Sequence, residues 1–123
     1  MAGEIEERLE KSVEVGTLYA FYGSLLTPRQ QEALGLYYDE DLSLGEIAAQ
    51  MAGSRQNVHE LITRSTEKLR HYEQALGLVR KAAQTSARLR EIRELLDRQQ
   101  WEEARQALIE LEETQEGEES HGL

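Results

Sequence analysis

The sequence predicts an all-α protein built around a helix-turn-helix. Apolar residues recur along nearly every segment at intervals of three and four, which is the period of an amphipathic helix and not of a strand. The 123-residue chain contains only one proline. Residues 43–70 contain two potential helix caps, separated by a turn that includes a glycine. Two short helices joined in this way are typical of a helix-turn-helix.

Two helices are expected before this motif. The first ends near Leu26, and acidic residues between positions 4 and 14 suit the positive end of its dipole. Thr27 then provides a cap, and Pro28 suits the first position of a second helix that reaches about Tyr38. The apolar stripe of the first helix consists of Val15, Leu18, Tyr22 and Leu25.

The two helices of the motif each have a recognisable start. Ser43 is followed three residues later by Glu46, which predicts a capping box. Ala52-Gly53 is expected to form the turn, with glycine adopting the positive φ. Ser54 then caps a long helix that Gly77 ends. The buried face of the shorter helix is predicted to be Ile47, Ala48 and Met51.

The candidate site lies at the start of the second motif helix, because this helix enters the DNA major groove in helix-turn-helix proteins. Its first side chains fit base recognition, since Arg pairs with guanine and Asn or Gln with adenine. They fit a solvated helix start equally well. The predicted nucleic-acid or partner-binding residues are Arg29, Ser54, Arg55, Gln56, Asn57, His59, Arg64 and Lys68.

Charge is distributed unevenly along the chain. The net charge is −10, which disfavours phosphate contacts. Residues 54–98 nevertheless hold 10 Lys/Arg and 6 Asp/Glu, whereas the remainder holds 4 and 18. This basic segment could face phosphate or an acidic protein surface. Surface pairing within a helix, as between Arg88 and Glu91, is the simpler interpretation of any single charge.

Composition also points away from several classes of function. The chain has no cysteine, so disulfides, thiolate metal sites and thiol nucleophiles are excluded. Three dispersed histidines, His59, His71 and His121, have no metal-ligand spacing. We therefore expect no metal, no cofactor and no catalytic residues. The absence of a long apolar run predicts no membrane insertion, and we expect a soluble cytoplasmic protein.

The C-terminal part has two apolar stripes that are out of phase. Leu89, Ile92 and Leu96 form the first, and a second begins at Trp101. The break predicts a helical hairpin with its turn near residues 97–100, although one continuous helix with rotated faces is an alternative. Neither stripe can be buried by its own helix, so this segment is a candidate partner or homodimer surface. The expected organisation is a core at 1–78, a hairpin at 79–112 and a disordered acidic tail at 113–123.

Several segments resemble the YlxM family of small bacterial helix-turn-helix proteins. They are Phe21-Tyr22-Gly23-Ser24-Leu25-Leu26-Thr27, Leu36-Tyr37-Tyr38, Asp41-Leu42-Ser43-Leu44-Gly45-Glu46-Ile47-Ala48, Ser54-Arg55-Gln56-Asn57-Val58 and Tyr72-Glu73-Gln74-Ala75-Leu76-Gly77-Leu78. The resemblance covers roughly residues 15–80. It implies a core of three to four helices, winged-helix-like or similar to the promoter-reading C-terminal domain of sigma factors. It also implies an accessory role in the signal recognition particle pathway.

Two functions follow as hypotheses. The first is a non-enzymatic accessory protein that binds the particle's RNA, its GTPase or both; because RNA duplexes have a narrow major groove, backbone or loop recognition is expected. The second is a dimeric, sequence-specific DNA-binding regulator. In that case Arg55, Gln56 and Asn57 would read bases, and Arg29, Arg64 and Lys68 would hold phosphates. The acidic balance outside residues 54–98 is a departure from a working promoter reader.

Overall fold

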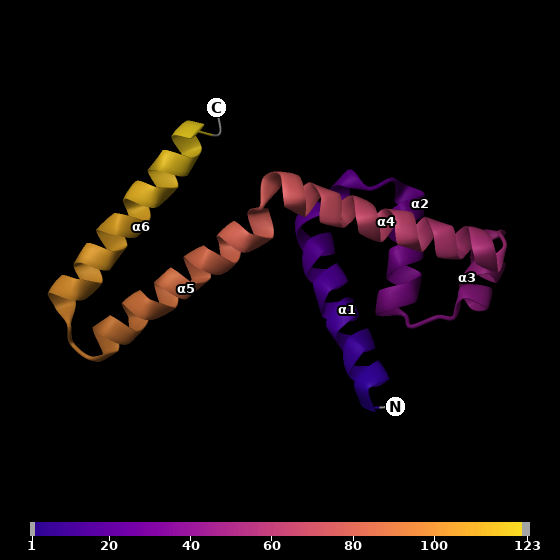
Figure 1. The fold of residues 1–123 in the computed structure, drawn as a ribbon, viewed down its shortest axis with the longest axis horizontal. Coiled ribbons are helices and arrows are strands. Elements are labelled where there is room, and N and C mark those ends of the chain that lie inside the picture. Colours follow the sequence, from indigo (N-terminus) through magenta and orange to yellow (C-terminus); the bar gives the residue numbers. More distant parts are fainter. Residues whose placement is uncertain (1, 122–123) are drawn as a thin grey trace. The chain divides into compact units, whose positions relative to one another are not determined.

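The computed structural model describes residues 2–121 as a series of helices with no strand in that range (Figure 1). Contacts divide the chain into two units, one ending at Val79 and the other beginning at Arg80. This division lies one residue beyond the predicted boundary after Leu78. The α-helices are α1 (Ala2–Tyr22), α2 (Pro28–Leu34), α3 (Leu44–Met51), α4 (Arg55–Leu76), α5 (Leu78–Asp97) and α6 (Trp101–His121).

The end of α1 differs slightly from the prediction. The α-helix stops at Tyr22, and a 3-10 turn, η1 (Gly23–Leu25), continues the chain. Because a 3-10 turn is more tightly wound than an α-helix, it shifts the phase of the apolar stripe. Leu25 is therefore exposed, and Leu26 is buried in its place. Val15, Leu18 and Tyr22 are buried as predicted.

The second helix begins at the predicted cap. Thr27 and Gln30 form a capping box, with backbone-to-side-chain distances of 2.9 and 3.2 Å. α2 then widens into a π-helical turn, η2 (Gly35–Asp39), in which the Glu40 amide donates to the Gly35 carbonyl. Helical structure thus ends at the acidic segment, close to the predicted Tyr38.

The core of the first unit forms around α4. This helix packs against α1, α2 and α3, so residues distant in the sequence share one apolar interior (Figure 1). The predicted face of α3 is buried, which confirms that part of the motif. Tyr19 and Phe21 lie on the other side of α1 and are partly exposed. The central buried residues are Tyr22, Ile47, Val58, Ser65 and Leu69.

The turn between α3 and α4 corrects one prediction. Ala52 carries the positive φ, at 53°, while glycine adopts a positive φ only at Gly77 among the described residues. The amides of Ala52 and Gly53 both donate to the Ala48 carbonyl, and this geometry places the left-handed residue directly at the helix end. Gly77 ends α4 with φ of 65°, as predicted.

The second unit is a helical hairpin, so the alternative of one continuous helix is wrong. α5 ends at Asp97 and α6 begins at Trp101, and Gln99 has a φ of 62° in the turn. Ile92 and Ala104 are buried near this turn. The Gln115 side-chain amide donates to the Thr85 hydroxyl at 3.1 Å between the helices.

α6 extends into the segment for which the sequence predicts a disordered acidic tail. α6 continues to His121, so the segment from Glu113 to His121 is helical, while residues 122–123 lie outside the described residues. Glu and Gln are good helix formers, and propagation from an established helix is easier than nucleation. No helix within residues 2–121 is long and apolar enough to cross a membrane.

Candidate nucleic-acid interface

Each of the two motif helices, α3 and α4, begins with a side-chain cap. Ser43 and Glu46 form the predicted capping box at the start of α3, with both distances at 3.2 Å. The Ser54 hydroxyl accepts from the Asn57 amide at 3.1 Å and so caps α4. The backbone at the front of α4 is therefore fixed, while the side chains of residues 55–57 remain exposed.

The exposed surface of α4 contains a central ridge opposite the core. Val58, Ile62 and Leu69 mark the buried side of the helix. Residues on the opposite side recur at intervals of four, three and four, so they line up along the helix. We call this set the outer ridge, and it consists of Gln56, Glu60, Thr63 and Glu67. Only Gln56 among these was a predicted site residue.

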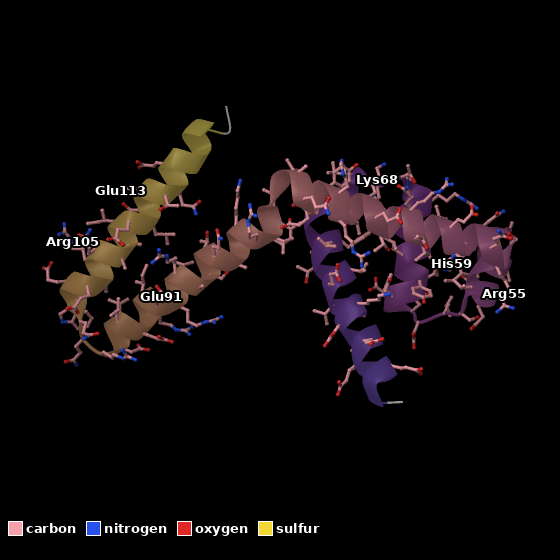
Figure 2. The ribbon with its side chains drawn as sticks, viewed as in Figure 1. Arg55, His59, Lys68, Glu91, Arg105 and Glu113 are labelled. Carbon is pink, nitrogen blue, oxygen red and sulfur yellow. The ribbon has the colours of Figure 1, made fainter. Side chains whose placement is uncertain are left out.

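The remaining predicted residues of α4 fall on two different edges. Asn57, Arg64 and Lys68 share one side, because their spacings of seven and four return to the same face. We call this set the basic edge. His59 lies one turn beyond Arg55 on the other side of the helix. In Figure 2, Lys68 lies on one edge of α4, and His59 and Arg55 lie on the other.

Arg29 and Arg55 lie near the glycines of the motif. A side-chain carbon placed on Gly53 would stand 3.9 Å from the Arg29 guanidinium, so α2 brings this arginine to the turn. A carbon on Gly45 would stand 3.6 Å from Nε of Arg55. The predicted site residues therefore surround the front of α4 and do not form one continuous patch.

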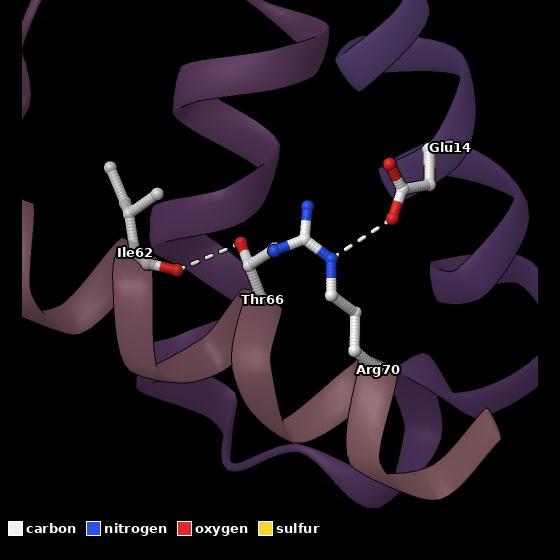
Figure 3. A network of polar contacts seen from close by, with 4 residues as sticks. All are labelled: Glu14, Ile62, Thr66 and Arg70. Atoms are coloured by element: carbon white, nitrogen blue, oxygen red, sulfur yellow. Dashed lines mark hydrogen bonds and ion pairs between the residues drawn. The ribbon is translucent and has the colours of Figure 1, made fainter. Parts of the chain in front are cut away.

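One further arginine on α4 is held by α1. Nε of Arg70 donates to the Glu14 carboxylate at 2.9 Å (Figure 3). Beside it, the Thr66 hydroxyl donates to the Ile62 carbonyl within the same helix. By contrast, neither Arg64 nor Lys68 is ion-paired with a residue in the described part of the chain. Arg64 is exposed and Lys68 is half-buried, so the basic edge adds two cations to the exposed Arg55 at the front of α4.

The outer ridge contains exposed residues that the sequence analysis did not include in the candidate site. Glu60 and Glu67 place two carboxylates on the side of α4 that would enter a groove first. Helical periodicity could have found them, because both follow Gln56 at helical intervals. Within residues 2–121 no three His, Cys, Asp or Glu side chains are grouped so that they could hold a metal ion.

The fold and the exposed front of α4 define a helix-turn-helix protein. The model of the UPF0122 family, described as YlxM/p13-like helix-turn-helix proteins, matches residues 9–109. The chain belongs to this family, and the match extends well beyond the segments that carried the resemblance in the sequence.

Curated relatives support the same assignment. A UPF0122 protein of Desulforamulus reducens is 51% identical over 84 residues, which cover 68% of this chain and 72% of that protein. A UPF0122 protein of Symbiobacterium thermophilum is 50% identical over 97 residues, covering 79% and 91%. The UPF0122 protein YlxM of Bacillus subtilis is 40% identical over 102 residues, covering 83% and 93%. All three are bacterial proteins of similar length.

Proposed function

We propose that this chain is a non-enzymatic, cytoplasmic accessory protein of the signal recognition particle pathway, binding the particle's RNA, its GTPase or both. The pathway follows from the YlxM resemblance described above. The observation that carries the mode of binding is the division of α4 into a basic edge and an acidic outer ridge. Arg64 and Lys68 on the basic edge would contact phosphates or acidic side chains.

The outer ridge argues against deep insertion of α4 into a DNA groove. Glu60 and Glu67 would approach the negative potential of the duplex, and the cost would have to be offset by cations elsewhere. Arg70 is already neutralised by Glu14. Recognition of an RNA backbone or loop from the side of α4 avoids this repulsion and agrees with the narrow major groove of RNA.

Sequence-specific DNA binding is the second candidate function. The observation in its favour is that Gln56 and Asn57 are exposed at the front of α4, where their amides could pair with adenine. Arg29 and Arg55 lie nearby, at the turn and beside α3, and could hold phosphates or pair with guanine. A carboxylate on the ridge could also accept from cytosine, so Glu60 does not exclude this function.

A titration against three fluorescent ligands tests the proposal. The ligands are the particle's RNA, its GTPase protein and random duplex DNA, each at two salt concentrations. We expect tight, salt-sensitive binding to the RNA or binding to the GTPase, with negligible affinity for DNA. Binding to DNA with neither particle component recognised would overturn the proposal.

Matched variants identify the surface that is used. Arg64→Glu should weaken binding strongly, because it reverses the charge of the basic edge. Lys11→Glu is the control, since Lys11 is exposed on α1 and the change in net charge is the same. Equal effects of the two variants would indicate a response to net charge alone. A loss of base preference in Gln56→Ala and Asn57→Ala would instead favour DNA reading.

A further inference from the structure

The helical hairpin of the second unit covers only part of its apolar surface. Ile92 on α5 is 8% exposed and Ala104 on α6 is 2% exposed. The apolar residues three positions before and four positions after each of them are between 42% and 60% exposed. We call these four side chains the hairpin face, and they are Leu89, Leu96, Trp101 and Leu108.

Helix geometry places the four side chains on one side of the hairpin. At about 100° per residue, positions three before and four after a reference residue lie about 60° and 40° to the same side of it. On α5, Leu89 and Leu96 are therefore rotated to one side of Ile92. On α6, Trp101 and Leu108 are rotated in the same sense from Ala104. Because the two helices run in opposite directions along the hairpin, equal rotations bring both exposed pairs to the same face.

Away from the turn the two helices of the hairpin are separated by a groove, and Ala107 and Leu111 are only half-buried there. The space between the helices there is a groove of about 320 Å³ with a mixed lining, in which Lys81, Arg88 and Glu110 lie beside Ala107 and Leu111. The bridging contact at this end is the hydrogen bond between Gln115 and Thr85. Two helices packed in this way leave their apolar stripes to be covered by something else.

We propose that the hairpin face binds the same face of a second copy of this chain, forming a two-fold four-helix bundle with α5 of each copy over α6 of the other. Charge selects this partner and this arrangement. α5 carries five basic and three acidic residues, whereas α6 carries one basic and eight acidic residues. Packing α5 on α6 of the partner therefore brings opposite charges together. Packing α5 on α5 would oppose like charges.

The size of the face fits a weak dimer. Each helix is about 30 Å long and about 10 Å wide, so one whole side of the hairpin presents on the order of 600 Å² per copy, and the hairpin face occupies about the third of it nearest the turn. Stable interfaces bury about 800 Å² per partner. Because the hairpin falls below this size, we expect a dimer whose population rises with protein concentration.

Sedimentation equilibrium over a concentration series tests whether the second copy binds. The expected mass rises to twice the 14.1 kDa of the chain. Leu89→Glu and Leu108→Glu should each weaken association roughly tenfold or more, with unchanged helical circular dichroism because both positions are exposed. Val13→Glu, on an exposed position of α1, is the control and should dimerise normally. A monomer at every concentration, or equal weakening by the control, overturns the proposal.

Engineered cysteines test the arrangement, since the chain has none of its own. Leu89 lies eight residues before the end of α5, and Leu108 lies seven residues after the start of α6. In the proposed bundle these positions face each other between copies. A mixture of Leu89→Cys and a tagged Leu108→Cys chain should therefore oxidise to the mixed disulfide. Only Leu89→Cys homodimers, or no disulfide at all, would overturn the arrangement.

Discussion

Tyr22 and Glu73, 51 residues apart in the sequence, are joined by a hydrogen bond of 2.5 Å in which the phenol donates to the carboxylate. The two side chains also accept hydrogen bonds from the first two backbone amides of α5. Leu78 donates to the Tyr22 oxygen at 3.1 Å, and Val79 donates to the Glu73 carboxylate at 3.0 Å. α5 follows Gly77 and lacks a Ser, Thr or Asp cap. Tyr22 and Glu73 therefore supply from α1 and α4 the acceptors that a local cap would provide.

The first prediction concerns alkaline pH. Burial, and then the hydrogen bond to Glu73, raise the pKa of Tyr22 above its ordinary value of 10.0. Because the protonated phenol is favoured in the fold, its contribution to stability is fully present below pH 10 and is lost as pH rises through the folded pKa. We expect urea midpoints to fall as pH rises above 10, the ordinary pKa of the phenol.

Tyr22→Phe separates this effect from general alkaline unfolding. The variant should be less stable at neutral pH, because the Glu73 carboxylate and the Leu78 amide lose a partner, but its pH dependence should be shallower. Burial also raises the pKa of Tyr38, so Tyr38→Phe is a matched comparison that leaves the cap of α5 intact. A wild-type midpoint that is constant above pH 10 would contradict the prediction.

The second prediction concerns the turn of the motif. Ala52 has a φ of 53°, a conformation that costs a residue with a Cβ about 1–2 kcal/mol. Ala52→Gly should therefore raise the free energy of unfolding by roughly 1 kcal/mol, after the greater entropy of glycine in the unfolded chain is subtracted. Ala49→Gly, in the exposed interior of α3, should lower it by about 1 kcal/mol. Equal destabilisation in both urea titrations would show that the conformation of Ala52 is unstrained.

The third prediction compares the two caps of the motif. Ser43→Ala should lower the free energy of unfolding by about 1–2 kcal/mol, because it breaks a reciprocal capping box with Glu46. Ser54→Ala should cost less, about 1 kcal/mol, since only the Asn57 amide loses its acceptor. Ser86→Ala on the exposed side of α5 is the control for removing a hydroxyl. Chemical denaturation followed by circular dichroism gives the free energy of unfolding of each variant. A larger loss of stability in Ser54→Ala than in Ser43→Ala would contradict the prediction that the reciprocal capping box is the stronger cap.

The caps were predictable from the sequence because they depend on residues three positions apart. Ser43 with Glu46, Ser54 with Asn57, and Gly77 all act within one helical turn, and their side-chain chemistry selects the structure locally. The left-handed residue at Ala52 was not predictable in the same way. The packing of α3 on α4 determines where the chain reverses, and this overrides the preference of the neighbouring glycine.

The candidate site was predictable only in part, for a similar reason. The sequence identified cations along α4 but did not show that Arg70 pairs with Glu14, because that contact depends on where α1 packs. The separation of His59 from Lys68 around α4 follows from periodicity and was available from the sequence. The link between Tyr22 and Glu73 lay within two segments of the family resemblance, although their contact is visible only in three dimensions.

The last prediction measures how the basic edge acts. If Arg64 and Lys68 each contact a phosphate, Arg64→Ala should reduce the slope of log affinity against log salt by about 0.7 for single-stranded RNA or about 0.9 for a duplex. Glu60→Gln tests whether the outer ridge approaches the nucleic acid. It should leave side-on RNA binding nearly unchanged, whereas insertion of α4 into a groove would make the variant bind more tightly because a carboxylate is removed. Fluorescence titrations at several salt concentrations give both quantities. A tighter Glu60→Gln complex with an unchanged slope in Arg64→Ala would locate binding on the outer ridge and not on the basic edge.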